Sequence, residues 1–137
     1  MTGQGGREVP PRPGLSKAEL EIARIVWELK SAGVRQVFET LPAGRDIDFT
    51  TVQTYLRRLE EKGYLNAKLD GRNRVYSPKV RPQTVIRETV GEMVDLLFGG
   101  ETLPLMKHLV EERRFSPDDI DQLRQLLDRL EGGRDEK

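Results

Sequence analysis

The chain has 137 residues with 23 basic and 23 acidic side chains, a size that suits one domain with a helical extension. No apolar run approaches the roughly 18 residues that a membrane span needs, and residues 1–14 lack the apolar stretch of a secretory signal, so we expect a cytoplasmic protein without membrane contact. The absence of cysteine excludes disulfides, thiolate metal sites and cysteine nucleophiles.

The zero net charge conceals two halves of opposite sign. Residues 1–80 carry 14 Lys and Arg against 10 Asp and Glu, whereas residues 81–137 carry 9 against 13. A basic half joined to an acidic half favours a module that meets nucleic acid, followed by a module that meets another protein. Chance surface composition is the alternative.

The N-terminal part of the chain predicts a tail and two helices. Residues 1–14 are rich in glycine and proline, which predicts a flexible tail. Ser16 and Glu19 have the spacing of a capping box, and the apolar residues that follow predict a helix to about Ala32. Gly33 interrupts the pattern, and residues 34–41 predict a second, two-turn helix.

A third helix is predicted over residues 49–62. Its inward face is formed by Val52, Leu56 and Leu59. Either Asp48 or Thr50 is expected to cap its start, and the glycine at position 63 ends it.

Alternation over residues 64–69, a turn signal at 70–73 and extended structure over 74–77 predict a two-stranded hairpin. Three helices followed by a hairpin form the plan of a winged helix-turn-helix domain, here residues 15–80. We therefore predict a mainly α fold with a small β-hairpin wing.

Three further amphipathic patterns follow, around residues 85–97, 103–110 and 116–130. They contain too few apolar residues for a separate core, so we predict a helical dimerisation region over residues 81–131 and a flexible tail over 132–137. The expected dimer-interface residues are Ile86, Val90, Met93, Leu97, Leu105, Leu109, Leu123 and Leu127.

The outward face of the third helix carries hydroxyls, an amide and arginines, which suit base edges and phosphates. We expect the bases to be contacted by Thr50, Thr51, Gln53, Thr54 and Arg57. The expected DNA-backbone contacts are Ser16, Lys17, Arg58, Arg72, Asn73 and Arg74, the last three at the hairpin tip. The alternative is that the helix face and the hairpin tip are ordinary solvated surface.

Enzymatic signatures are weak. No serine lies in a nucleophile-elbow setting, and no glycine-rich phosphate loop precedes a lysine and a hydroxyl. The single histidine, His108, lies in an amphipathic pattern, and no second ligand type supports a metal site. We expect no catalytic residue, metal or cofactor.

Several motifs together resemble the penicillinase repressor (BlaI/MecI) family over about residues 15–130. The matching segments read LSKAELE at 15–21, IVW at 25–27, TVQTYLRRLEEKGYL at 51–65, VYSP at 75–78, LFGG at 97–100, LVE at 109–111 and FSPDDIDQL at 115–123. The copper-responsive branch of that family carries a cysteine-rich C-terminal motif, which this chain lacks.

The resemblance implies a transcriptional repressor that binds a palindromic operator as a homodimer. It also implies control by cleavage in the middle C-terminal helix, around His108 and Leu109, with a sensor metalloprotease as partner; the neighbouring residues differ from the family's cleavage pair. Two rival functions remain, a winged-helix protein-interaction module and a ligand-sensing regulator. The polar face of the third helix argues against the first, and the scarcity of aromatic residues argues against the second.

Overall fold

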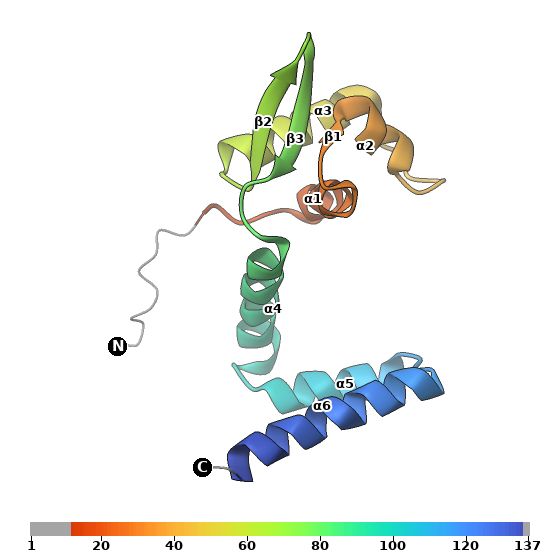
Figure 1. Ribbon diagram of the computed structural model, residues 1–137, viewed down its shortest axis with the longest axis vertical. Coiled ribbons are helices and arrows are strands. Elements are labelled where there is room, and N and C mark those ends of the chain that lie inside the picture. The colour runs from red at the N-terminus through yellow and green to blue at the C-terminus, as the bar shows by residue number, and fades with distance from the viewer. Residues whose placement is uncertain (1–11, 136–137) are drawn as a thin grey trace. The chain divides into compact units, whose positions relative to one another are not determined.

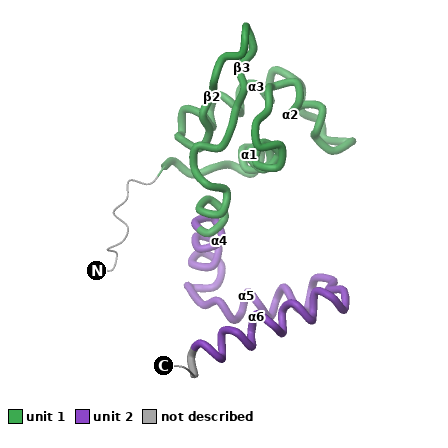
Figure 2. The backbone as a smooth tube through the Cα atoms, viewed as in Figure 1, with its two compact units in different colours: residues 1–87 green, residues 88–137 purple. Residues whose placement is uncertain are grey.

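The computed structural model describes residues 12–135 and confirms a mainly helical fold with a small antiparallel sheet (Figure 1). The chain divides into two units, residues 1–87 and 88–137 (Figure 2). The boundary lies later than the expected one at residue 80, because α4, Pro82–Phe98, begins in the first unit and buries Val85 in its core. Most of the expected tail, residues 1–11, lies outside the described residues.

Helix α1, Lys17–Leu29, begins with the predicted capping box. The backbone N–H of Glu19 donates to the Ser16 hydroxyl oxygen at 3.1 Å, and the Ser16 N–H donates to the Glu19 carboxylate at 2.9 Å. The prediction that this helix runs to Ala32 is wrong. Lys30 has a φ of 70°, which is incompatible with another helical turn.

Helix α2, Val34–Thr40, and helix α3, Phe49–Glu61, complete the helix-turn-helix. The Asp48 side chain accepts a hydrogen bond from the backbone N–H of Thr51 at 2.9 Å, so Asp48, and not Thr50, is the cap of α3. Gly63, with a φ of 88°, follows the last turn as predicted.

The sheet has one strand more than expected. Strands β2, Leu65–Asp70, and β3, Asn73–Pro78, form the predicted antiparallel hairpin, with Gly71 and Arg72 at its turn. The additional strand β1, Ala32–Gly33, pairs with the other edge of β3, so that Ala32 lies opposite Tyr76. A two-residue strand is too short to show alternation, which is why the sequence pattern missed it.

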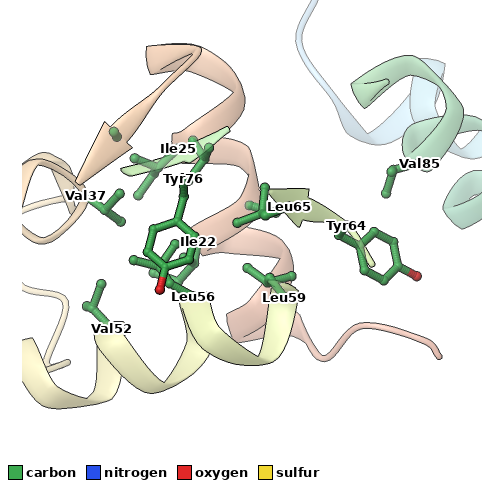
Figure 3. Close-up of a cluster of buried hydrophobic side chains, with 13 residues drawn as sticks. Ile22, Ile25, Val37, Val52, Leu56, Leu59, Tyr64, Leu65, Tyr76 and Val85 are labelled. Atoms are coloured by element: carbon green, nitrogen blue, oxygen red, sulfur yellow. The ribbon is translucent and has the colours of Figure 1, made fainter. Parts of the chain in front are cut away.

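The core of the first unit lies where α1, α2 and α3 meet the inward face of the sheet (Figure 3). Tyr76 reaches from β3 toward Leu56 on α3, and both side chains are fully buried. Each fully buried aliphatic side chain contributes about 1.5–3 kcal/mol to folding. The buried set is Ile22, Ala23, Ile25, Val26, Ala32, Val37, Val52, Leu56, Leu59, Tyr64, Leu65, Tyr76 and Val85.

The second unit contains the rest of α4, together with α5, Thr102–Glu112, and α6, Pro117–Asp135. Helix α6 starts as predicted, with a reciprocal pair of hydrogen bonds between Ser116 and Asp119. It continues through residues 132–135, which were expected to be a tail. Among residues 12–135, no helix is long and apolar enough to cross a membrane.

Candidate nucleic-acid interface

Helix α3 has one face in the core and one in solvent. Val52, Leu56 and Leu59 are fully buried, which fixes the rotation of the helix about its axis. The opposite face therefore presents Thr50, Thr54 and Arg57, all of them exposed. Short hydroxyl side chains followed by an arginine can read base edges in a DNA groove.

The first turn of α3 is held firmly. The hydrogen bond from the Thr51 N–H lowers the pKa of the Asp48 carboxyl, so this cap stays ionised at neutral pH. The Thr54 hydroxyl donates to the Thr50 carbonyl at 3.1 Å, which leaves its methyl group and its oxygen lone pairs available to a ligand. Thr51 and Gln53 are half-buried, so these two expected base-contacting residues present less surface.

The expected backbone-contacting residues differ in how free their charges are. Arg72 is exposed at the hairpin turn, Lys17 is exposed at the start of α1, and neither has an ion-pair partner within residues 12–135. The guanidinium of Arg58 lies 5.9 Å from the centroid of the Tyr55 ring, at cation–π distance. Ser16 is exposed but engaged as the cap of α1, and Asn73 is exposed as the first residue of β3.

Arg74 is not the free cation at the hairpin tip that the sequence suggested. Its Nη2 donates to both carboxylate oxygens of Glu60, at 3.0 and 3.2 Å, and its Nε is buried. The cause is strand alternation: Arg74 and the buried Tyr76 are two residues apart on β3 and point to the same side of the sheet. Arg74 is thus directed toward Glu60 of α3, and its half-exposed guanidinium is engaged in an ion pair.

The structure also shows contacts of two arginines near α3 that the sequence did not predict. The guanidinium of Arg35 on α2 lies 5.1 Å from the ring centroid of Phe49, the first residue of α3. Arg45, in the loop before α3, donates to both carboxylate oxygens of Glu21 at 2.6–3.0 Å and lowers the pKa of that carboxyl. No periodic signal reveals either partnership, because each joins two different elements.

A second ion pair fastens the C-terminal end of α3. The Lys62 ammonium donates to the Glu19 carboxylate at 2.7 Å and to the Gly14 carbonyl at 2.9 Å, while the Tyr64 hydroxyl donates to the Pro13 carbonyl at 2.8 Å. Burial raises the pKa of Glu19, but hydrogen bonds from Lys62 and from the capping turn outweigh this effect and lower it. Residues 13 and 14, where a tail is expected, are therefore tied to Lys62 and Tyr64, just after the end of α3.

The expected dimer-interface residues fall into three groups. Those with exposed side chains are Ile86, Val90, Met93, Leu97 and Leu127. Leu109 and Leu123 are half-buried, and Leu105 is buried at 9% exposure, so Leu105 has little surface left for a second chain. His108 is exposed on α5. Within the described residues, no three His, Cys, Asp or Glu side chains gather as metal ligands would.

The chain is similar to known proteins over most of its length. Residues 15–129 match the model of the family described as Penicillinase repressor. The chain is 28% identical to the penicillinase repressor of Bacillus licheniformis over 85% of this chain and 91% of the relative. It is 38% identical to the transcriptional regulator BlaI of Mycobacterium tuberculosis (strain CDC 1551 / Oshkosh), over 73% and 72% of the two chains.

Among solved structures, the DNA-binding domain of the repressor BlaI is 35% identical to this chain. The match covers 53% of this chain and 88% of that one, with a TM-score of 0.48. The family match, by contrast, extends from just before α1 into α6 and so includes both units. The chain therefore belongs to the penicillinase repressor family of DNA-binding transcriptional repressors, which are not enzymes.

Proposed function

We propose that two copies of this chain bind a palindromic operator, each with α3 in the major groove, and block transcription by occupying the promoter. The observation that carries this proposal is the division of α3 into a fully buried face and an exposed face with Thr50, Thr54 and Arg57. A helix anchored in this way presents its polar face as a rigid unit, which base recognition requires.

The exposed face of α3 supports direct readout of bases. The methyl groups of Thr50 and Thr54 suit the thymine C5-methyl group, and the guanidinium of Arg57 suits guanine O6 and N7. Gln53, although half-buried, has an amide that can pair with adenine. Arg58 and Arg72, at the edge of this face and at the hairpin turn, are the proposed phosphate contacts.

The second unit supports the homodimer. Large apolar side chains are exposed along all three of its helices, with Leu96 reaching 83% exposure. Surface of this kind in a small protein usually meets another chain. The proposed interface uses Val90, Met93 and Leu97 of α4 and Leu127 of α6, with Leu109 and Leu123 at its margins.

Release from DNA by proteolysis in α5 is a second, separate proposal. His108 is exposed and Leu109 half-buried within a regular helix. A protease binds an extended backbone, so cleavage there requires local opening of α5. Incubating the full chain with a membrane-anchored metalloprotease and locating the cut by mass spectrometry tests this route, and an intact α5 would contradict it.

The test of DNA binding starts from a pool of random duplexes, from which the full chain selects its preferred sequence. Replacing Arg57 with Ala is expected to weaken binding to the selected duplex by about 1–3 kcal/mol per half-site and to relax sequence preference, because alanine cannot pair with a base edge. Fluorescence anisotropy against a scrambled duplex measures both effects.

The matched control is Arg114→Ala, which removes the same charge from the exposed segment between α5 and α6. It should leave sequence preference unchanged. A wild-type chain that enriches no duplex would instead favour the protein-interaction alternative, and equal losses for the two variants would remove α3 from the recognition site.

A further inference from the structure

The outer half of the β2–β3 hairpin has little apolar support. In the hairpin register Leu69 lies opposite Arg74, one rung inside the pair of Asp70 and Asn73 at the turn. Leu69 is 68% exposed, although alternation places it on the same side of the sheet as the buried Leu65. Beyond the rung of Tyr76, therefore, the hairpin extends past the apolar core of its unit.

At this rung the hairpin contacts α3 through one ion pair. The two hydrogen bonds from Arg74 join β3 to Glu60, which belongs to the last turn of α3. The side chains of Arg74 and Glu60 are 41% and 32% exposed. A pair this exposed adds little to global stability. Its effect is local, because it links a protruding strand to the helix proposed to enter the DNA groove.

We propose that the Arg74–Glu60 pair is a strut that fixes the wing relative to the recognition helix, and that Arg72 is the wing residue that binds phosphate. Arg74 is then a positioning residue, although its charge and its place near the turn made it an expected DNA contact. This inference rests on the proposed DNA binding. In addition, the wing is already oriented before DNA binds, which lowers the entropic cost of ordering the wing on binding.

The rival interpretation is that Glu60 merely holds back a phosphate-binding arginine. The two interpretations predict opposite signs for Glu60→Gln, an isosteric change that removes one negative charge close to the proposed DNA surface. If Arg74 is a phosphate clamp, the variant frees it and binding tightens. If Arg74 is a strut, the wing loses its orientation and binding weakens despite the more favourable charge.

The experiment compares the full chain with Glu60→Gln, Arg74→Met, the double variant and Arg72→Met as the matched arginine control. The probes are the duplex selected from the random pool and a scrambled duplex of equal length. Affinity is measured between about 50 and 200 mM salt, because the slope of log affinity against log salt falls by about 0.9 for each phosphate that the protein no longer neutralises. Thermal unfolding confirms that each variant is folded.

If the Arg74–Glu60 pair is a strut, Glu60→Gln and Arg74→Met each weaken binding to the selected duplex roughly 5- to 20-fold. The double variant then binds the duplex no more weakly than either single variant. Both keep the wild-type salt slope, whereas Arg72→Met lowers it. Amide relaxation at Gly71 and Arg72 should show a more mobile turn in Glu60→Gln than in the wild type.

Tighter or unchanged binding by Glu60→Gln would overturn the inference, and so would a reduced salt slope for Arg74→Met. In either case the expected decrease in salt slope for Arg72→Met would still support the proposed function. A wild-type chain that selects no duplex would overturn the proposed function and this inference together.

Discussion

The two units differ in how far their apolar side chains are buried. The first unit encloses a core of large side chains, and the nine largest fully buried ones, which run from Ile22 to Tyr76, lie below 2% exposure. In the second unit only Val94 and Leu105, among the described residues, reach the buried class. Most of the other large apolar side chains of its helices are well exposed, as Leu96 and Leu97 are. The first unit has a closed core of its own, whereas the second unit leaves most of its large apolar side chains uncovered in a single chain.

This difference indicates where each type of contact belongs. A closed core can hold α3 rigid in one copy of the chain, so the proposed base contacts need only the first unit. Exposed apolar helices gain stability only when a second surface covers them. We expect changes in the first unit to act on folding and DNA contacts, and changes in the second unit to act through assembly.

Removing the second unit is the strongest test of this difference. A chain of residues 1–87 retains the core, including Val85, and should fold as a monomer. Its affinity for the selected duplex should fall about 10²- to 10⁴-fold, because the second half-site no longer adds to the first. Sedimentation velocity and anisotropy measure the two effects. A truncated chain that still sediments as a dimer would contradict the assignment of the interface.

Within the first unit, Leu56→Ala should lower the free energy of unfolding by about 2–5 kcal/mol, because a fully buried side chain leaves a cavity. Urea unfolding of the 1–87 chain gives the value without interference from assembly. Leu69→Ala is the control in the same unit. Its side chain is exposed, so the change should stay within about 0.5 kcal/mol. Similar losses of unfolding free energy for the two variants would mean that Leu56 is not a core residue.

Within the second unit, Leu97→Glu should weaken self-association about 10- to 100-fold, because a charge would be buried between the copies. The melting temperature of the 1–87 core should not change, and DNA binding should weaken only at concentrations where dimers dissociate. Leu69→Glu places the same charge on an exposed residue of the first unit and should leave the dimer intact. A dimer that tolerates Leu97→Glu would exclude this part of α4 from the interface.

The smallest expected effect concerns Glu19, whose folded pKa lies below its ordinary value of 4.5. The stability contributed by this carboxylate is present above that ordinary value and is lost as the pH falls through the lowered folded pKa. At neutral pH the urea midpoint of the wild type should therefore be higher than that of Glu19→Gln. The difference between the two midpoints should disappear in acid. A difference in urea midpoint that stays the same at every pH would show that Glu19 contributes no pH-dependent stability.

Local signals in the sequence locate the helices and the hairpin, although the ends of α1 and α6 differ from the expected ones. A cap at Asp48 or Thr50, the glycine at position 63 and the apolar period between them predicted α3 almost to the residue, and the structure selects Asp48 as the cap. The strand β1 was missed because two residues carry no period, and α1 was predicted too long because no sequence signal marks the positive φ of Lys30.

The candidate site was predicted less completely than the fold. The outward face of α3 follows from helical spacing alone, and the exposed positions of Thr50, Thr54 and Arg57 agree with it. A sequence shows which residues are charged but not which charges pair. The contact between Arg74 and Glu60, 14 residues apart, depends on how a strand meets a helix. The same reason explains why the Lys62 pair with Glu19 was not predicted.

This last pair also bears on the order of events during folding. The hydrogen bonds between Ser16 and Glu19 span three residues, so they can form as soon as the first turn of α1 nucleates. Lys62 is 43 residues from Glu19 and reaches it only after a long loop has closed. The same carboxylate thus takes part in an early local step and in a late long-range one. The first helix can begin alone, but its first turn acquires its last hydrogen bond only when the C-terminal end of α3 has packed against it.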